Sequence, residues 1–490
     1  RATGKPTLFN AAVKAADFLY NFCTTAPEEL AGNAICPSHY MAVTEMYRET
    51  GDPKYLELSK KFIDIRGMVK EGTDDNQDRI PFREQYNAMG HAVRANYLYA
   101  GVADLYLETG EDQLMHNLAA IWDDIVLRKM YINGACGALY DGTSPDGTDY
   151  QPANIQKVHQ SYGRPYQLPQ STAHNETCAN IGNMLFNWRM LEATGDGRYA
   201  DIMENCFFNS ILCGISLDGK RYFYTNPLRM SDELPYTLRW PKERKEYISC
   251  FCCPPNTLRT LCETQDYAYS MGRQEVYVNL YGENQMKVML DKKNQLVVAQ
   301  HTDYPWDGRV ILEIQQVKKN TPMTFKLRIP SWCEVYSLSV NDKKVDAKVE
   351  NGYAVVTGNW KKGDFIALDM TMQAKLIEAN PLVEEARGQV AVQRGPIIYC
   401  IESQDLNGQN IDNIALPINA QFTPKEVTIE GSRMMALETQ AYVRDAKAWE
   451  YQLYRTVDRT KRTATIRLIP YYAWGNRGKS EMSVWIPVAL

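Results

Sequence analysis

The sequence predicts a multidomain α + β protein, in which a helical region is followed by two all-β sandwiches. Two observations predict this fold class. Over the first 270 residues or so, apolar side chains recur at helical spacing on either side of short turns, and from about Glu275 onward they alternate with polar ones. A chain of 490 residues suits two to four domains. We predict domains at residues 1–270, 271–375 and 376–490.

Three turns of the form Thr-Gly-acid mark the helical region, with their glycines at Gly51, Gly110 and Gly195. Glycine suits the left-handed residue that ends a helix, and the acid after it suits the start of the next helix. Because the turns are short, the helices on either side should be antiparallel neighbours. Successive hairpins must stack to bury their apolar faces, either as an open solenoid or as a closed toroid.

The helix count and one long insert qualify this picture. A toroid of six hairpins needs twelve helices, and about eight can be placed, from residues 9–22 to residues 256–269. Residues 134–169 are rich in Gly, Pro, Asp and Gln, which predicts a long loop. A loop of that length inside a compact domain is usually functional or disordered.

The remainder of the chain has the pattern of short strands. Residues 325–330 alternate between apolar and polar side chains, and turn signals such as Asn351-Gly352 separate the strands, which predicts an antiparallel sandwich. A second all-β block starts near Lys375 and includes residues 389–393 and 397–400.

Composition excludes several classes of protein. The net charge is −5, from 54 basic and 59 acidic residues that are mixed along the chain without a basic stripe, so we expect no nucleic-acid partner. No apolar run approaches the ~18 residues that span a bilayer, so we expect no membrane partner. Twelve cysteines are too few for a disulfide scaffold. The 31 tyrosines suit sugar pockets but equally suit cores, and the oligomeric state stays open.

The candidate chemistry lies in two short segments, each just before an apolar helix. One carries Glu176 and Cys178, and the other carries Cys250, Cys252 and Cys253. Thiolate sulfur and carboxylate oxygen suit tetrahedral Zn²⁺. Residues i and i+2 of a helix point about 200° apart, so Glu176 and Cys178 can share an ion only where the chain enters the helix. Cys252 and Cys253 need a bend, and the two prolines after them should forbid a regular helix there.

Spacing alone leaves two other interpretations of these cysteines. They are compatible with buried thiols that hold no metal, because cysteine is among the most buried residue types. They are also compatible with a purely structural zinc site, which usually has four protein ligands.

Two histidines add weight to a functional interpretation. His91 and Glu176 each lie 19 residues before the glycine of a turn, so they occupy equivalent positions in two hairpins, and His39 also lies at a helix start. In a closed toroid these helix starts would lie at the same end of the toroid. They would bring His39, His91, Glu176 and Cys178 together around one pocket. For each histidine alone, a hydrogen-bonded core residue is the alternative.

Four segments of the chain resemble a known family. Residues 176–183 (Glu-Thr-Cys-Ala-Asn-Ile-Gly-Asn), 252–256 (Cys-Cys-Pro-Pro-Asn), 90–92 and 223–228 are similar to signatures of the zinc-dependent β-L-arabinofuranosidases of glycoside hydrolase families 127 and 146. The resemblance covers essentially the whole chain, since the β segments also resemble that family's β domains. Residues 134–140 resemble the arabinan-acting family 146 more than family 127.

The resemblance implies an (α/α)6-type helical toroid as the catalytic domain, followed by two β-sandwiches. It implies one Zn²⁺ as cofactor, with Cys252 as the nucleophile, Glu176 as the general acid/base, and Cys250 outside the ligand set. The implied metal ligands are Glu176, Cys178, Cys252 and Cys253. The residues expected to contact the sugar are His39, His91 and Tyr224, together with Gln160, which stands where relatives carry a carboxylate, or His159 beside it.

The function that the sequence favours is an exo-acting, retaining β-L-arabinofuranosidase on plant cell-wall arabinan or other arabinose-bearing glycans. One alternative is a glycosidase of the same fold for another terminal sugar, because pocket shape and not fold sets the sugar. Another is a non-catalytic glycan-binding protein with a structural zinc site. The sequence begins at Arg1 without a methionine or an apolar leader, and with the resemblance this suggests a bacterial periplasmic or secreted protein.

Overall fold

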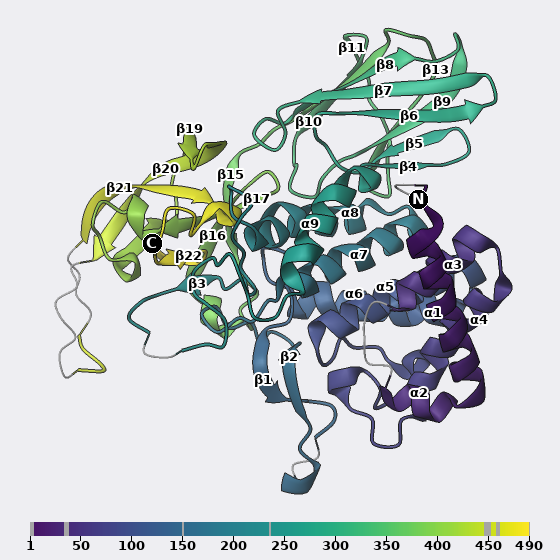
Figure 1. The fold of residues 1–490 in the computed structure, drawn as a ribbon. Helices are drawn as coiled ribbons and strands as arrows, with labels where there is room; N and C mark the ends of the chain where they lie inside the picture. Colours follow the sequence, from purple (N-terminus) through teal and green to yellow (C-terminus); the bar gives the residue numbers. More distant parts are fainter. Residues whose placement is uncertain are drawn as a thin grey trace. The chain divides into compact units, whose positions relative to one another are not determined.

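The protein has a helical N-terminal region followed by β-rich regions, as the sequence predicted (Figure 1). The computed structural model describes residues 4–33, 39–148, 151–234, 237–444, 452–456 and 461–489. Two compact units, residues 1–194 and 195–490, are described below each by itself. The division into three domains at residues 270 and 375 stays a prediction.

The first unit is mainly helical. Within it α3 packs against α4 and α5, and α5 packs against α6 and α7, so the hairpins predicted from the turns are neighbours. Its helices in the described residues are α1 (Pro6–Thr25), α2 (Pro27–Asn33), α3 (His39–Thr50), α4 (Pro53–Asp64), α5 (Ala92–Thr109), α6 (Asp112–Asp124) and α7 (Thr177–Thr194).

The turn glycines have the conformation that the sequence predicted. Gly51, Gly110 and Gly195 have φ of +70°, +67° and +67°, a region that favours glycine because it has no Cβ. After Gly51, the Asp52 carboxylate accepts a hydrogen bond from the Lys54 N–H at the start of the next helix. The Glu111 carboxylate makes no such cap and instead binds Arg83.

Residues 134–169 are not the simple loop that the composition predicted. Two strands, β1 (Leu139–Thr143) and β2 (Lys157–Ser161), pair antiparallel there and form a hairpin that extends away from the helices of its unit (Figure 1). Glycine-rich composition concealed the strands, because cross-strand pairing outweighs the weak intrinsic preference of such residues. The hairpin carries His159 and Gln160 on β2.

The second unit begins with helices and continues as β-sheets. Its two α-helices in the described residues are α8 (Gly197–Asn205) and α9 (Cys253–Glu263). The prediction that two prolines forbid a helix after Cys253 was wrong, because Pro254 and Pro255 lie in the first turn of α9. Backbone N–H groups there have no partner within the helix, so the missing proline donors cost little.

Two sheets form a sandwich in the middle of the second unit, around one apolar core that includes Leu312, Phe325 and Leu327. One sheet has the strand order β11-β10-β14-β8-β7-β6 and the other β12-β13-β9-β5-β4. Their strands are β4 (Tyr269–Met271), β5 (Glu275–Val278), β6 (Asn284–Asp291), β7 (Asn294–Thr302), β8 (Arg309–Gln316), β9 (Thr321–Arg328), β10 (Tyr336–Val340), β11 (Lys343–Lys344), β12 (Val349–Glu350), β13 (Tyr353–Trp360) and β14 (Phe365–Met370).

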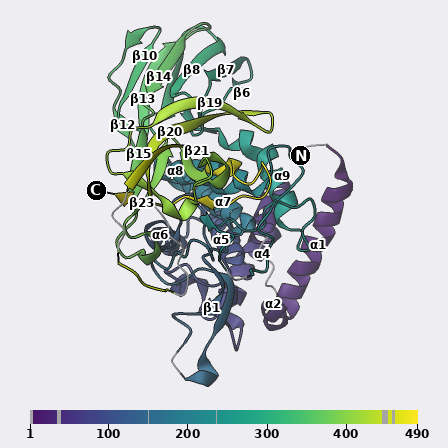
Figure 2. The ribbon, with the colours of Figure 1, turned by 90° about the vertical axis from the view of Figure 1, so that its left-hand side faces the viewer.

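A third sheet follows in the chain, with a core of its own that includes Val392, Tyr399 and Leu468. Its β19, β20 and β21 run side by side in antiparallel register (Figure 2). Its strands are β3 (Arg229–Met230), β15 (Ala374–Glu378), β16 (Gln389–Arg394), β17 (Ile397–Glu402), β18 (Ile414–Pro417), β19 (Thr423–Ile429), β20 (Ser432–Arg444), β21 (Lys461–Pro470), β22 (Met482–Ser483) and β23 (Ile486–Ala489).

Among the described residues, no helix is both long enough and apolar enough to pass through a bilayer.

Candidate active site

The four predicted metal ligands all lie at helix starts. Glu176 directly precedes α7, and Cys178 is the second residue of that helix. Cys252 is the N-cap of α9, and Cys253 is its first residue. The requirement that Glu176 and Cys178 lie where the chain enters a helix is therefore met. Glu176, Cys178 and Cys253 are buried, whereas Cys252 is exposed.

These side chains form one cluster. One carboxylate oxygen of Glu176 and the Sγ atoms of Cys178, Cys252 and Cys253 all lie within 4.8 Å of one another. The sulfur atoms of Cys252 and Cys253 are 3.8 Å apart. Two sulfurs at the corners of a tetrahedron around zinc lie about 3.8 Å apart when each Zn–S bond is about 2.3 Å. The donor set and its spacing therefore fit Zn²⁺.

Tyr224 lies beside the exposed thiols. Its hydroxyl oxygen is 3.6 Å from Cys252 Sγ and 3.7 Å from Cys250 Sγ, and the two sulfurs are 3.9 Å apart. The Tyr224 ring stacks on Trp240 with centroids 3.7 Å apart, which fixes the direction of the hydroxyl. Burial raises the pKa of the Cys250 thiol, and the hydrogen bond from Tyr224 partly opposes this. Residues Cys250–Cys253 are called the cysteine segment below.

His91 occupies the position in α5 that Glu176 occupies in α7. It is the N-cap of α5, and the residue before it, Gly90, has φ +66°, just as Asn175 before Glu176 has φ +42°. The left-handed residue turns the chain into each helix, and after glycine, asparagine is among the residues that tolerate that conformation best. The equivalence predicted from the spacing of the turns is thus confirmed in the backbone.

His91 is buried and bonds to a neighbour on β2. Its Nε2 lies 2.8 Å from Gln160 Oε1, and its ring meets the His159 ring edge-on with centroids 5.2 Å apart. Burial lowers the pKa of His91 to about 3, and the charge of Arg94 adds to that shift. The ring is therefore neutral at physiological pH.

The backbone at Gln160 is also unusual. Its φ is +49°, an uncommon conformation for a residue other than glycine, and such conformations concentrate at functional sites.

Sequence reasoning missed Asp75, which holds these groups together. The Asp75 carboxylate accepts from the His159 backbone N–H at 2.9 Å and lies 3.0 Å from His159 Nδ1. The only sequence signal was a run of polar residues, Asp74 to Gln77, upstream of Gly90. We call Asp75, His91, His159 and Gln160 the histidine cluster.

His39 has an apolar setting. It is the first residue of α3, and its ring lies 4.0 Å from the Tyr40 ring and 4.4 Å from the Phe62 ring, measured between centroids. These ring contacts orient the imidazole, and the residue is partly buried.

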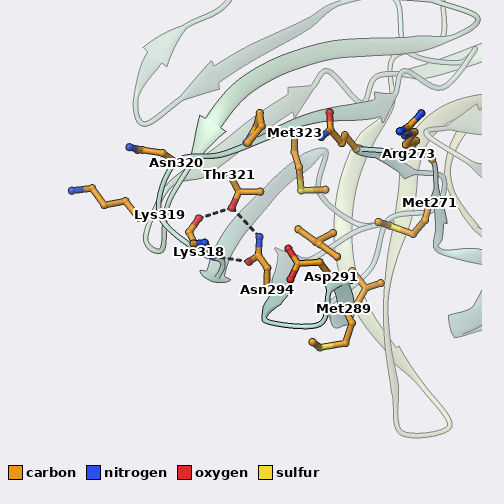
Figure 3. Close-up of a pocket in the computed structure, with 15 residues that line it drawn as sticks. Met271, Arg273, Met289, Asp291, Asn294, Lys318, Lys319, Asn320, Thr321 and Met323 are labelled. Carbon is orange, nitrogen blue, oxygen red and sulfur yellow. Dashed lines mark hydrogen bonds between the residues drawn. The ribbon is translucent and has the colours of Figure 1, made fainter.

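A separate cavity of about 630 Å³ lies in the middle sandwich (Figure 3). Met271, Met323 and Arg273 are among the residues that line it, and the Asn294 side chain donates to Thr321 Oγ1 at 3.1 Å across its floor. None of the predicted site residues lines this cavity. It is therefore not part of the predicted site.

Comparison with known proteins shows the family of the chain. The model of the β-L-arabinofuranosidase GH127 catalytic domain matches residues 1–266. Models of the GH127 middle domain and of the family's C-terminal domain match residues 275–372 and 374–487. The chain belongs to glycoside hydrolase family 127. It is therefore a glycoside hydrolase, and the likeness to family 127 that the sequence motifs indicated is confirmed, whereas the closer likeness to family 146 stays a proposal.

A curated relative covers almost the whole chain. A non-reducing end β-L-arabinofuranosidase of Bifidobacterium longum subsp. longum is 32% identical over 522 residues, which cover 99% of this chain and 76% of the relative.

Solved structures also match. A structure described as a glycoside hydrolase has a TM-score of 0.97 at 64% identity, covering 100% of this chain and 81% of its own. A GH127 β-L-arabinofuranosidase from Geobacillus stearothermophilus T6 has a TM-score of 0.84 at 33% identity. The match covers 92% of this chain and 72% of the matched chain.

Proposed function

We propose that this glycoside hydrolase is an exo-acting, retaining β-L-arabinofuranosidase that removes terminal β-L-arabinofuranose from plant cell-wall arabinan or other arabinose-bearing glycans. The observation that carries the proposal is the cluster of one carboxylate and three thiols at helix starts, in a chain whose curated relative is named a non-reducing end β-L-arabinofuranosidase. A cluster with an exposed sulfur can do chemistry that a fully enclosed one cannot.

Cys252 is the proposed nucleophile. Its sulfur attacks the anomeric carbon as the bond from that carbon to the leaving oxygen breaks, and the sugar is left bound to sulfur. Glu176 is the proposed general acid/base: it first gives its proton to the leaving oxygen, and then takes a proton from the water that displaces sulfur. Two displacements at the same carbon leave its configuration retained.

The metal ligands in this proposal are Glu176, Cys178, Cys252 and Cys253. When bound, Zn²⁺ would hold sulfur as thiolate at neutral pH, where a free cysteine with a pKa of roughly 8.5 is mostly protonated. The Cys252 thiol donates to the Tyr224 hydroxyl oxygen at 3.6 Å, and once that sulfur is a thiolate the hydroxyl could turn from Cys250 and donate to it.

The sugar contacts in this proposal are His39, His91, His159, Gln160 and Tyr224. One structural feature supports His91 in particular. Its Nδ1 is buried and has no hydrogen-bond partner among the described residues, a costly state that a sugar hydroxyl would relieve.

Three finer points stay proposals. The likeness of residues 134–140 to the arabinan-acting family 146 supports arabinan as substrate. The neighbouring hairpins of the first unit support an (α/α)6 toroid. The periplasm or the extracellular space is the proposed compartment.

The test is release of p-nitrophenol from p-nitrophenyl β-L-arabinofuranoside by the full chain, with a thiol reductant present. We expect release from this substrate, none from the α anomer, and arabinose first formed as the β anomer by NMR. Removing zinc with a chelator should abolish release, with about one zinc per chain measured before and none after, and added Zn²⁺ should restore it.

The outcomes separate the alternatives. Release from a different terminal sugar alone would favour the same fold acting on another glycan. No release from any glycoside by a zinc-loaded protein that binds glycan would favour a binding protein with a structural zinc. Full activity after complete removal of zinc would contradict the proposed role of the metal.

A further inference from the structure

Asp75 contacts both histidines of the histidine cluster from one short turn. Its Oδ1 accepts from the His159 N–H at 2.9 Å, and its Oδ2 lies 3.0 Å from His159 Nδ1. Its own backbone carbonyl accepts from the His91 N–H at 3.1 Å. The residue is buried, and Arg94 Nη1 lies 3.0 Å from the same Oδ2 and balances its charge.

These contacts determine which nitrogen of His159 carries the proton. An ionised carboxylate can only accept, so the nitrogen that faces Asp75, Nδ1, must be the N–H. In the neutral ring Nε2 then has a free lone pair. The side chain is 42% exposed, so a ligand can reach it.

The same reasoning applies to His91. The oxygen Oε1 of Gln160 accepts, so His91 Nε2, 2.8 Å away, carries the proton. Its Nδ1 then has a free lone pair, and this atom is buried without a hydrogen-bond partner among the described residues. Two imidazoles whose rings meet edge-on therefore each present an acceptor nitrogen.

We propose that Asp75 is a positioning residue, which sets His159, beside the His91 ring that bonds to Gln160, as a hydrogen-bond acceptor for a hydroxyl group of the terminal sugar. The inference rests on the proposed function, because it assumes that His159 contacts the sugar. A hydroxyl can donate to the free nitrogen. A carboxylate or phosphate group would place its lone pairs against that of the nitrogen and is disfavoured, so this acceptor selects neutral sugars over acidic ones.

Asp75→Asn is the decisive variant. The amide has only one acceptor oxygen, for which the His159 N–H, the His159 Nδ1–H and Arg94 then compete, so the Nδ1–H form is no longer fixed. A ring protonated at Nε2 offers the sugar a donor in place of an acceptor. We expect kcat/KM on p-nitrophenyl β-L-arabinofuranoside to fall about tenfold to a hundredfold, mainly through KM.

Asp74→Asn is the matched control. Asp74 is in the same turn and is also buried, more deeply than Asp75, but its carboxylate bonds to Arg79 and to Ser144. This variant also removes a buried negative charge from the turn, and it leaves both imidazoles with their partners. We expect kcat/KM within about twofold to threefold of the wild type.

A spectroscopic measurement separates positioning from structural damage. Nitrogen-15 NMR of the histidine-labelled, zinc-loaded chain reports which ring nitrogen is protonated, and a His159→Gln variant assigns the signal. We expect His159 as the Nδ1–H form in the wild type, and a clearly larger share of the Nε2–H form in Asp75→Asn.

Three results would overturn the inference: the Nε2–H form of His159 in the wild type, an Asp75→Asn variant with kcat/KM within twofold of the wild type, or an Asp74→Asn variant that loses as much activity. Failure of the proposed function would give a different result, because the wild type itself would then release no arabinose. The NMR result would in that case still decide the Asp75 geometry.

Discussion

The histidine cluster and the cysteine segment contribute to one proposed reaction, but they are organised by different forces. In the histidine cluster, hydrogen bonds of 2.8 to 3.1 Å from a carboxylate, an amide and a backbone carbonyl hold each group. In the cysteine segment, sulfurs lie 3.8 and 3.9 Å apart, within reach of weak hydrogen bonds between thiols, but thiolates at these distances would repel one another.

Folding alone can therefore organise the proposed sugar-binding part, whereas the proposed reactive part would depend on a bound cation. If all were ionised, the three cysteines and one glutamate within 4.8 Å would carry a formal charge of −4, of which a bound Zn²⁺ would offset half. The predictions below test the two parts separately.

The largest effect is expected from Cys252→Ala. Loss of the nucleophilic sulfur should lower kcat on p-nitrophenyl β-L-arabinofuranoside by at least about 10⁴-fold, because the group proposed to form the bond to the anomeric carbon is then missing. The control is Cys262→Ser, another exposed cysteine of α9 that lies outside the ligand cluster. Near-normal turnover by the alanine variant would remove Cys252 as nucleophile.

An intermediate effect is expected from Gly90→Ala. A Cβ at this position would meet the Asp74 carbonyl oxygen at 1.7 Å, and φ is +66°, so the turn that carries Asp75 must shift. We expect a loss of about 2–4 kcal/mol in the free energy of unfolding, measured with urea.

Gly110→Ala is the matched control for that variant. Its φ is +67°, but nothing lies within 4 Å of the added Cβ, so only the backbone strain remains, about 1 kcal/mol. Equal losses in the two variants would show that the turn around Asp75 is not tightly packed.

The smallest effect concerns pH and His91. Its pKa is about 3 in the folded protein, against 6.5 for the ordinary side chain, so below pH 6.5 the unfolded chain binds a proton that the folded one does not. Stability should therefore fall between about pH 6.5 and 3. Relative to His91→Gln, the wild type should lose about 1–2 kcal/mol between pH 7 and pH 5 in urea unfolding. Parallel losses in both proteins would show that His91 is not buried as a neutral ring.

Much of the site could be predicted because its signals are local. The turn glycines determine where helices start, so the 19-residue spacing placed His91 and Glu176 at equivalent positions. The roles of Glu176 and Cys252 came instead from family motifs, and those roles stay proposals. Asp75 could not be predicted, because its partner His159 lies 84 residues away and only folding brings them together.

By itself the sequence determined the order of most helices and strands, the family, and which residue types could hold a metal. Periodicity, turn residues and motifs each depend on only a short stretch of sequence. Only the tertiary structure decided that Leu139–Thr143 pairs with Lys157–Ser161, that a helix starts at Cys253, and which ring nitrogens of His91 and His159 contact Gln160 and Asp75. The reason is physical: a hydrogen bond between distant residues depends on a distance in space, which sequence separation does not specify.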